Sequence, residues 1–368
     1  MKVAIVHDYI KEYGGAERVL EALHEIYPDA PIFTSVYLPK FLGPHKSRFA
    51  KMDIRTSFLQ SFPFKQKLIS PFRLLSSIAF RSFDFSNFNV VIVSQTGAYL
   101  PNAINKRNAV HVTYCHTPPR YLYGFATARE WKKNPVFRVL GEAANYFLKT
   151  KDYKFAQGVD YFIANSQNVR GRIQKFYKKD AVVIYPPVDI VNKKETVKNE
   201  PFYLTGGRLA RPKHTDLVIE TFAKNGLPLK VFGKAFAGYG EELKNIAGPN
   251  IEFLGEVGDE EKLSLMSKAK AFIFASEDED FGITPVEAMG TGTPVIAYRS
   301  GGVLETVVDE ETGLFFDELT IESLEKTIQR FEKNKFNPQN CIKQAQKFRK
   351  ESFKREIKDF IEKIYKAS

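Results

Sequence analysis

The chain has 368 residues, which is too long for one ordinary hydrophobic core and fits two domains. Hydrophobic residues make up 43% of it and charged residues 26%, which excludes an intrinsically disordered protein. The two cysteines, Cys115 and Cys341, lie far apart in the sequence, so we expect a cytoplasmic protein without a disulfide framework.

The net charge of +11 is concentrated in the first half. Residues 1–185 hold 27 Lys and Arg against 13 Asp and Glu, whereas the remainder holds 27 against 30. We expect the first half to face an anionic partner, such as lipid headgroups, a phosphorylated substrate or nucleic acid. The apolar run after Met1 is too short for a signal peptide, and no later run reaches the roughly 18 apolar residues of a spanning helix, so any membrane contact is expected to be peripheral.

Short β-branched runs alternate with helical patterns in the first half, which is typical of buried parallel strands in an α/β domain. The predicted strands are Lys2–Val6, Val90–Val93, Val110–Tyr114, Tyr161–Ala164 and Val182–Ile184. We therefore place an N-terminal Rossmann-like domain at residues 1–187.

The same rhythm begins again in the second half. The predicted strands there are Phe202–Thr205, Leu229–Phe232, Ile251–Leu254, Ala271–Phe274 and Val295–Ala297, and a helix is predicted at Asp259–Lys268. This pattern indicates a second α/β unit, a C-terminal Rossmann-like domain at residues 201–346.

A linker and a terminal helix complete the predicted organisation. Pro186 and Pro187 precede a polar stretch, and together they predict a hinge at residues 188–200. Residues 347–368 read as a charged helix with one apolar face, formed by Phe353, Ile357, Phe360 and Ile361. We expect this helix to pack back on the N-terminal domain.

Glycines follow the first predicted strand. Gly14 and Gly15 stand directly before a helical pattern, where backbone N–H groups can approach a phosphate or a sugar closely. A purely structural turn is the alternative interpretation. In two open α/β sheets, the carboxyl ends of the strands and the following helix N-termini are where anionic ligands bind, so we expect a ligand cleft between the domains.

A basic turn follows the first strand of the second half. Arg208 and Lys213 stand five residues apart behind Gly206 and Gly207. Such a pair of cations can hold a diphosphate and stabilise the charge that develops when it leaves. A solvated basic turn is the alternative.

The most specific segment runs from Ser276 to Pro294 and contains two carboxylates eight residues apart. Glu279 is expected in a loop and Glu287 about one turn into a helix, where they can accept hydrogen bonds from sugar and ribose hydroxyls. The amides of Phe281 and Gly282, with Ile283 after them, are expected at the N-terminus of that helix.

With these motifs the sequence resembles the retaining family 4 glycosyltransferases of the GT-B fold, in which two Rossmann-like domains face a central cleft. The resemblance rests on Glu279-x7-Glu287, Gly207-Arg208-x4-Lys213 and Gly14-Gly15-x-Glu17, and it covers nearly the whole chain. It implies that Arg208 and Lys213 hold the donor diphosphate and that Glu279, with the Phe281 and Gly282 amides, holds the donor sugar. It further implies that Glu287 binds the ribose and that Gly15 approaches the phosphate from the other domain. One departure is Asp280, where the family usually has Gly or Ser.

A histidine follows the third predicted strand. By the same resemblance His116 contacts the donor sugar near the reaction centre, and a structural hydrogen-bonding histidine is the alternative. The strings Cys115-His116-Thr117-Pro118-x-Arg120-Tyr121-Leu122 and His7-Asp8-Tyr9 look like those of bacterial transferases of O-antigen and exopolysaccharide assembly, which are often mannosyltransferases that use GDP-mannose. This narrower resemblance implies transfer of mannose to a glycan or a polyprenyl-diphosphate-linked acceptor in surface polysaccharide synthesis.

Asp278-Glu279-Asp280 spells an Asp-x-Asp sequence, by which another transferase fold holds a divalent metal. We interpret it as coincidental, because no further His or carboxylate cluster accompanies it and Arg208 and Lys213 already serve the leaving group. The sequence thus predicts metal-independent catalysis without a cofactor, with the nucleotide sugar as co-substrate.

Residues 55–83 contain six Phe and five Lys or Arg but no Asp or Glu. The phenylalanines are Phe58, Phe62, Phe64, Phe72, Phe80 and Phe83. Aromatic insertion combined with attraction to anionic lipid is one interpretation, and it predicts peripheral contact with the inner face of a membrane. The alternative is that these side chains fill the core of the first domain beneath a basic face.

Other functions are weighed as alternatives. A transferase of the same fold with a UDP-sugar donor, or a sugar-nucleotide epimerase or phosphorylase, would share the diphosphate site. A nucleic-acid-binding protein would explain the basic first half, but no zinc-finger or RNA-recognition signature is present, so we expect no nucleic-acid partner. A dinucleotide oxidoreductase is disfavoured because Gly14-Gly15 is followed by Ala16-Glu17 rather than by the Gly-x-Gly-x-x-Gly pattern.

Overall fold

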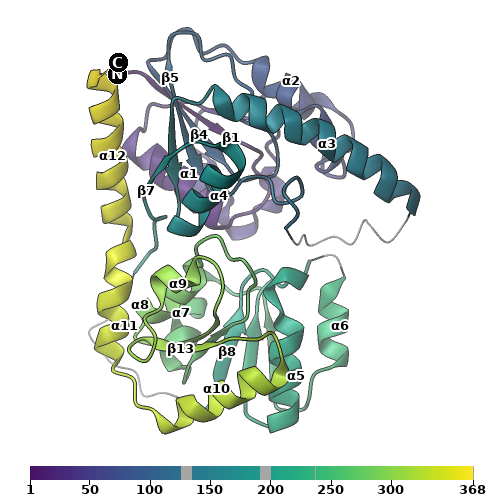
Figure 1. The fold of residues 1–368 in the computed structure, drawn as a ribbon, viewed down its shortest axis with the longest axis vertical. Helices are drawn as coiled ribbons and strands as arrows, with labels where there is room; N and C mark the ends of the chain where they lie inside the picture. The colour runs from purple at the N-terminus through teal and green to yellow at the C-terminus, as the bar shows by residue number, and fades with distance from the viewer. Residues whose placement is uncertain (126–134, 191–199, 237, 368) are drawn as a thin grey trace. The chain divides into compact units, whose positions relative to one another are not determined.

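A computed structural model describes residues 1–125, 135–190, 200–236 and 238–367 of the chain (Figure 1). These residues form two compact α/β units. The first contains residues 1–125, 135–187 and 350–367, and the second contains 188–190, 200–236 and 238–349. Of the predicted hinge at 188–200, residues 191–199 lie outside the described residues.

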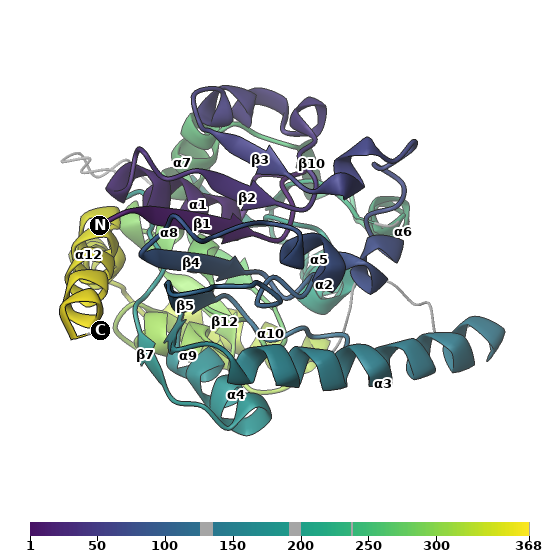
Figure 2. The same ribbon diagram turned by 90° about the horizontal axis from the view of Figure 1, so that it is seen from above.

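The first unit is built on a seven-stranded parallel sheet with the order β3-β2-β1-β4-β5-β6-β7 (Figure 2). Its strands are β1 (Val3–His7), β2 (Ile32–Thr34), β3 (Ile54–Thr56), β4 (Val90–Gln95), β5 (Val110–Cys115), β6 (Tyr161–Ala164) and β7 (Ala181–Val183). Five of them match predicted strands to within two residues at each end. The sequence did not predict β2 and β3, which have three residues each.

Helices connect these strands and cover the sheet. The α-helices of the first unit are α1 (Gly15–Ile26), α2 (Ser76–Arg81), α3 (Pro135–Gln157), α4 (Gln167–Tyr177) and α12 (Lys350–Ala367). Short 3-10 helices lie at η1 (Pro39–Phe41), η2 (Gly43–Phe49), η3 (Phe58–Ser61) and η4 (Pro71–Leu74). Among the described helices, none combines the length and the hydropathy that a membrane span requires.

Strand β1 shows why both faces of this sheet need helices. Its side chains alternate, so that Val3 and Ile5 join the core cluster beneath α1 and α12, whereas Ala4 and Val6 join the cluster on the opposite face. A parallel strand that is buried on both faces reads as a continuous apolar run, and this is how the sequence revealed it.

The C-terminal helix α12 packs against α1 in the first unit. Its buried side chains, all in the same core cluster, are Phe353, Ile357, Ile361 and Ile364. At one end Lys350 and Lys354 both pair with Glu25 of α1, at 2.5 and 3.2 Å. The apolar face of this helix is therefore covered by the N-terminal unit, on which we expected it to pack.

The second unit is built on a six-stranded parallel sheet with the order β10-β9-β8-β11-β12-β13. The strands are β8 (Tyr203–Gly206), β9 (Leu229–Phe232), β10 (Ile251–Gly255), β11 (Phe272–Phe274), β12 (Val295–Tyr298) and β13 (Gly313–Phe316). The sequence did not predict β13, since its four residues include no β-branched side chain.

Helices also flank the second sheet. They are α5 (Thr215–Asn225), α6 (Tyr239–Asn245), α7 (Asp259–Lys268), α8 (Ile283–Gly290), α9 (Val303–Thr306), α10 (Ile321–Lys333) and α11 (Pro338–Ala345), with 3-10 helices η6 (Arg211–Lys213) and η7 (Gln346–Phe348). Helix α7 has the bounds that the sequence predicted. The fold prediction of two Rossmann-like α/β units is confirmed.

The phenylalanines of residues 55–83 divide between the core and the surface. Phe72 and Phe80 are buried in the core cluster of the first unit, and Phe83 packs against it half-buried. Phe58 and Phe64 are exposed, by 42% and 70%, as are Phe62, Leu74 and Ile78. The core interpretation is thus correct for half of the segment, while the other half keeps large apolar side chains in solvent.

A buried carboxylic acid, Asp152 of α3, lies in the first unit and is only 3% exposed. Its Oδ2 atom accepts hydrogen bonds from the hydroxyl groups of Tyr123 at 2.8 Å and Tyr177 at 2.9 Å. Burial raises the pKa of Asp152 to about 7, although the two tyrosine hydrogen bonds act in the opposite direction. The folded protein therefore binds a proton here that the unfolded chain has already released above pH 4.

We predict that Asp152→Asn becomes increasingly stabilising as the pH rises from 5 to 8. A raised acid pKa makes the wild-type protein lose stability between the unfolded pKa near 4 and the folded pKa near 7. The amide cannot ionise, and its oxygen can still accept from both tyrosines. Thermal unfolding at several pH values should show a melting-temperature difference between variant and wild type that grows with pH. A difference independent of pH, as we expect for the exposed control Asp53→Asn, would contradict the assignment.

Candidate functional site

The predicted site residues lie at the carboxyl ends of strands in the middle of each sheet. In the first sheet β1 and β4 are neighbours from which the chain winds outward in two directions, and β8 and β11 have the same place in the second sheet. Such a switch point leaves a crevice at the carboxyl edge, where α/β proteins bind ligands. One cluster of predicted residues follows β1 and β5, and the other follows β8 and β11.

The glycine loop after β1 is closed by a carboxylate. Gly14 is the N-cap of α1, and its N–H donates to Oε2 of Glu17 at 2.9 Å, while Gly15 is the first helical residue. The first-turn acid thus satisfies one of the donors that a helix start leaves unpaired. The Gly14 amide, which we predicted to approach a ligand, is engaged by Glu17 in this structure.

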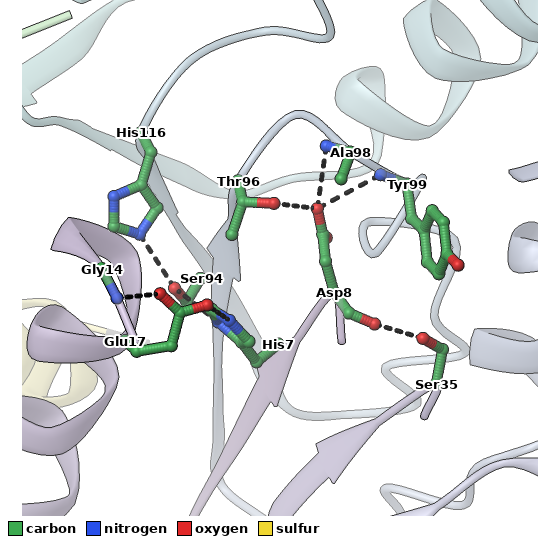
Figure 3. A network of polar contacts seen from close by, with 10 residues as sticks. All are labelled: His7, Asp8, Gly14, Glu17, Ser35, Ser94, Thr96, Ala98, Tyr99 and His116. Atoms are coloured by element: carbon green, nitrogen blue, oxygen red, sulfur yellow. Dashed lines mark hydrogen bonds and ion pairs between the residues drawn. The ribbon is translucent and has the colours of Figure 1, made fainter. Parts of the chain in front are cut away.

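His116 ends a chain of buried side chains from three adjacent strands (Figure 3). Its Nε2 atom lies 2.9 Å from the hydroxyl of Ser94 near the end of β4, and the same hydroxyl lies 3.1 Å from Nδ1 of His7 at the end of β1. His7 and Ser94 are register partners in the sheet. The remaining nitrogen of His7, Nε2, lies 3.6 Å from Oε1 of Glu17. The chain therefore connects the predicted histidine with the predicted glycine loop.

The backbone around His116 is held from two sides. Its N–H donates to the Gln95 carbonyl at 2.9 Å, and its carbonyl accepts from Nδ2 of Asn165 at 3.0 Å. Burial, assisted by the nearby ring of His7, lowers the pKa of His116 to about 3, so the imidazole is neutral at physiological pH. The side chain is 9% exposed, and a neutral ring in this position can serve as a hydrogen-bond donor or acceptor but not as a cation.

Asp8, next to His7, fixes the loop after β4 (Figure 3). Its Oδ2 atom accepts from Oγ1 of Thr96 at 2.5 Å and from the amides of Ala98 at 3.0 Å and Tyr99 at 3.2 Å. Burial raises the pKa of Asp8, against the lowering effect of these hydrogen bonds. Asp8 is completely buried, so in this structure its carboxylate holds the loop after β4 in place through these hydrogen bonds.

In the second unit, Lys213 forms an ion pair and hydrogen bond with Oε2 of Glu279. The hydroxyl of Ser276 donates to the same oxygen at 2.6 Å. Arg208 lies on the same turn, which follows β8, and is exposed. The structure thus brings together two residues to which the resemblance assigned different parts of the donor.

Glycines shape the loop that carries Glu279. Gly282 has a φ of +90° as the N-cap of α8, a conformation that L-residues rarely adopt, and Ile283 is the first helical residue. A Cβ atom on Gly301 would lie 2.4 Å from the carbonyl oxygen of Glu279, so only glycine fits there. Phe281 is 3% exposed and packs edge-to-face on Phe348 of the same unit, with ring centroids 5.4 Å apart. Its side chain is therefore part of the core, and only its backbone is suited to a ligand.

Glu287 is buried in α8 and has a cationic partner that the sequence did not suggest. Its Oε1 atom accepts from Nζ of Lys262 in α7 at 2.7 Å, and both side chains are almost inaccessible. The available signal was Lys262 one helical turn before Met266, which is a lysine on the apolar side of its helix. Removing Lys262 would leave the buried Glu287 carboxylate without this cation, whereas Lys262 also pairs with Asp259 at 3.3 Å.

The acidic run at residues 278–280 lies in the loop between β11 and α8. Within the described ranges, no group of three or more His, Cys, Asp or Glu side chains is placed to hold a metal ion. Asp278 has a φ of +50° and its N–H donates to the Ser300 hydroxyl at 3.2 Å. The Glu279 carboxylate is engaged by Lys213 and Ser276, as described above.

Sequence reasoning missed several of these residues. His7 and Glu17 were noted only within motifs, and Ser94, Lys262 and Gly301 were not considered. Polar residues at the carboxyl ends of consecutive apolar strands would have been a usable signal, because such ends meet at one edge of a parallel sheet.

Two family models match the chain. The model described as "Glycosyltransferase Family 4" matches residues 13–191, and the model described as "Glycosyl transferases group 1" matches residues 187–348. The boundary between them falls close to the boundary between the two structural units.

The chain is also similar to named proteins from other organisms. The chain is 24% identical to the alpha-1,3/1,6-mannosyltransferase ALG2 of Kluyveromyces lactis, over 84% of this chain and 71% of that protein. Proteins of the same name from Rhizomucor pusillus and Dictyostelium discoideum are each 26% identical, over 62% and 65% of this chain and 60% and 66% of their own lengths.

Solved structures match the whole fold. A sucrose-phosphate synthase from Thermosynechococcus elongatus superposes with a TM-score of 0.74 at 18% identity, covering 100% of both chains. Anabaena HepE, in a crystal structure in complex with UDP-glucose, superposes with a TM-score of 0.71 at 18% identity, covering 99% of this chain and 100% of that one. At such identities the likeness concerns the fold. The two family models together span residues 13–348, and the chain is a glycosyltransferase of the GT-B fold that belongs to family 4.

Proposed function

We propose that this glycosyltransferase moves a hexose from a nucleoside diphosphate to a hydroxyl group of a glycan or lipid-linked glycan, with retention of anomeric configuration. The observation that carries the proposal is the second-unit cluster, in which Lys213, Glu279 and the α8 N-terminus gather at the carboxyl end of β8 and β11. Cations and helix amides at one sheet edge suit a diphosphate, and a carboxylate beside them suits sugar hydroxyls.

In the proposed donor complex, Arg208 and Lys213 neutralise the diphosphate as it leaves. Lys213 is paired with Glu279 in this structure, so donor binding would exchange that ion pair for contacts with the phosphate and with the sugar, respectively. Glu279 would keep the Ser276 hydroxyl as a fixed donor. In this complex both cations would lie beside the phosphate oxygen that departs. The protein would therefore reorganise little as negative charge develops on that oxygen.

The remaining donor contacts are also proposals. Glu287 would bind the ribose hydroxyls while Lys262 holds its carboxylate in position, and Gly14 and Gly15 would approach the phosphate from the first unit. His116 would contact the donor sugar. We nominate no covalent nucleophile, and the leaving diphosphate would itself accept the proton of the acceptor hydroxyl.

Mannose from GDP-mannose is the proposed donor, and support comes from the relatives named alpha-1,3/1,6-mannosyltransferase. A UDP-sugar is the alternative, which the UDP-glucose complex of the structurally similar HepE favours. Surface polysaccharide assembly, and the use of a polyprenyl-diphosphate-linked acceptor at the inner face of a membrane, are proposals that rest on the sequence resemblance.

We predict that GDP-mannose and GDP raise the melting temperature of the purified protein, by roughly 5–10 °C at 100 times their Kd. Glu287→Gln should weaken this binding by about 10- to 100-fold, the usual worth of hydrogen bonds to a carboxylate. Glutamine retains an acceptor for Lys262, so the fold is preserved better than by alanine. A thermal-shift screen with GDP-mannose, UDP-glucose, UDP-galactose, UDP-GlcNAc and the parent diphosphates measures both effects.

Glu252→Gln is the matched control, since it makes the same charge change in the same unit at an exposed strand residue. It should bind donors as the wild type does. A response to UDP compounds alone would replace the proposed donor, whereas an unchanged response of Glu287→Gln would contradict the proposed ribose site. Transfer of sugar to a glycan acceptor, rather than epimerised product without one, separates a transferase from an epimerase.

We predict that catalysis is independent of divalent metal. Arg208 and Lys213 supply the positive charge that a metal would otherwise provide. Transfer rates measured in excess EDTA should therefore stay within about twofold of those with added Mg²⁺ or Mn²⁺, since the loss of a metal that stabilises the leaving group would cost several kcal/mol. A rate that falls in chelator and recovers with one of these ions would overturn the prediction.

Peripheral membrane contact through residues 55–83 is also proposed. The exposed side chains Phe58, Phe62 and Phe64 lie in a segment without acids, and Lys67 beside them is exposed as well. Apolar insertion and attraction to anionic headgroups would act together at such a surface. A lipid-linked acceptor would be met there.

We predict that the protein floats with vesicles that contain phosphatidylglycerol and much less with phosphatidylcholine alone. The double substitution Phe62→Ser and Phe64→Ser should reduce flotation by about tenfold or more, since each exposed phenylalanine contributes on the order of 1–2 kcal/mol on insertion. Leu304→Ser, a comparable change at an exposed residue of the second unit, is the control. Absence of wild-type binding to anionic vesicles would refute membrane contact.

A further inference from the structure

The buried chain that joins Glu17 to His116 has a direction. It consists of a carboxylate, an imidazole, a hydroxyl and a second imidazole, and each contact involves atoms that can donate or accept only in certain combinations. All four side chains are at most 9% exposed, so solvent cannot freely supply alternative partners. The protonation of one end therefore constrains the other.

The carboxylate defines the first link. Glu17 carries acceptors only, and its Oε2 atom is already occupied by the Gly14 N–H. Its Oε1 atom faces Nε2 of His7 at 3.6 Å, and this nitrogen is sealed from solvent with no hydrogen-bond partner among the described residues. A lone pair at Nε2 would be repelled by the carboxylate oxygen, whereas an N–H at Nε2 is attracted to it. The proton of a neutral His7 is thus expected on Nε2.

The next two links follow from hydrogen-bond capacity. With its proton on Nε2, His7 presents a lone pair at Nδ1, so the Ser94 hydroxyl must donate to it. A hydroxyl has a single proton, and Ser94 can therefore only accept from His116. This requires the N–H of His116 to be on Nε2, which leaves a lone pair on Nδ1.

The second ring nitrogen of His116 is not part of this series of contacts. Its Nδ1 atom makes no hydrogen bond within the part of the chain that the structure describes. We propose that Glu17, His7 and Ser94 are positioning residues that keep the ring proton of His116 on Nε2 and present Nδ1 as an acceptor for a hydroxyl of the donor sugar. The use of that acceptor rests on the proposed function, whereas the placement of the proton does not.

The series of polar contacts from Glu17 to His116 also links two parts of the site. Glu17 holds the Gly14 amide with one oxygen and faces His7 with the other, so the glycine loop and the His116 tautomer depend on one carboxylate. A change at Glu17 should therefore be detected at His116, which is three links away.

The test is the tautomer of His116 in Glu17→Gln. The glutamine oxygen must replace Oε2 as acceptor for Gly14, which turns its NH₂ group toward Nε2 of His7. Every hydrogen bond of the chain then reverses: His7 carries its proton on Nδ1, Ser94 donates to His116, and the N–H of His116 moves to Nδ1. The ring ¹⁵N shifts and N–H couplings of selectively ¹⁵N-labelled histidine distinguish the two tautomers, and His116→Gln assigns the signal among the six histidines.

The expected result is an Nε2–H tautomer of His116 in the wild type and an Nδ1–H tautomer in Glu17→Gln. Glu21→Gln removes the same charge one turn further along α1, where the carboxylate contacts Tyr13 and Arg48, and should leave His116 unchanged. An Nδ1–H tautomer in the wild type, or no change in Glu17→Gln, would overturn the proposal.

Ser94→Ala gives an independent test if Glu17→Gln does not fold. It removes the central link, so His116 should lose its single-tautomer signature and populate both forms. A His116 that remains entirely in the Nε2–H form without Ser94 would equally overturn the proposal, since the proton would then be placed by something else.

Transfer assays separate this inference from the proposed function. If His116 accepts a hydrogen bond from the donor sugar, Glu17→Gln should lower kcat/KM by about tenfold, the usual worth of one hydrogen bond, and Glu21→Gln should not. A reversed tautomer with unchanged transfer would retain the positioning chain and remove the proposed sugar contact of His116. An unchanged tautomer with reduced transfer would overturn the positioning role and assign the loss to the glycine loop, which Glu17 also holds.

Discussion

Parallel strand pairing is the constraint on which the site depends. Because all strands of a sheet run in the same direction, their carboxyl ends meet at one edge, and the chain leaves that edge in two directions from the central pair. This geometry brings His7, Ser94 and His116 together from three strands, and it gathers the turn after β8 with the loop after β11. None of these contacts is local in sequence, and all follow from sheet order.

Several polar side chains at the carboxyl edges of the two sheets are held by specific partners. Glu287 has Lys262, Asp8 has Thr96 and two backbone amides, and Glu279 has Lys213 and Ser276. A buried polar group without a partner is costly, so such networks hold loops in one conformation. The same networks limit how the site can respond to a ligand, since binding must exchange existing partners for new ones. The pair of Lys213 and Glu279 is the clearest case, because both residues are only partly buried.

The first unit combines a structural and a surface role in one segment. Residues 55–83 supply Phe72 and Phe80 to the core, and they also expose Phe58, Phe62 and Phe64. A composition count cannot separate these groups, because burial depends on how each part of the segment packs on the first unit. The positive charge of residues 1–185 can likewise be counted from the sequence. Packing decides which of these charged side chains lie together on the surface.

The sequence alone determined the alternation of strands and helices, the division into two α/β domains, and the glycosyltransferase motifs at residues 14–17, 207–213 and 279–287. These features are local, since a buried parallel strand reads as an apolar run and a glycine before a helix is visible in place. Only the tertiary structure decided that α12 packs on α1, that Lys262 reaches Glu287, and that His7 and His116 share the hydroxyl of Ser94. Ser94 is 87 residues from His7 and 22 from His116, and strand order and register set such distances in space. Those are collective properties of the sheet, which no short stretch of sequence encodes.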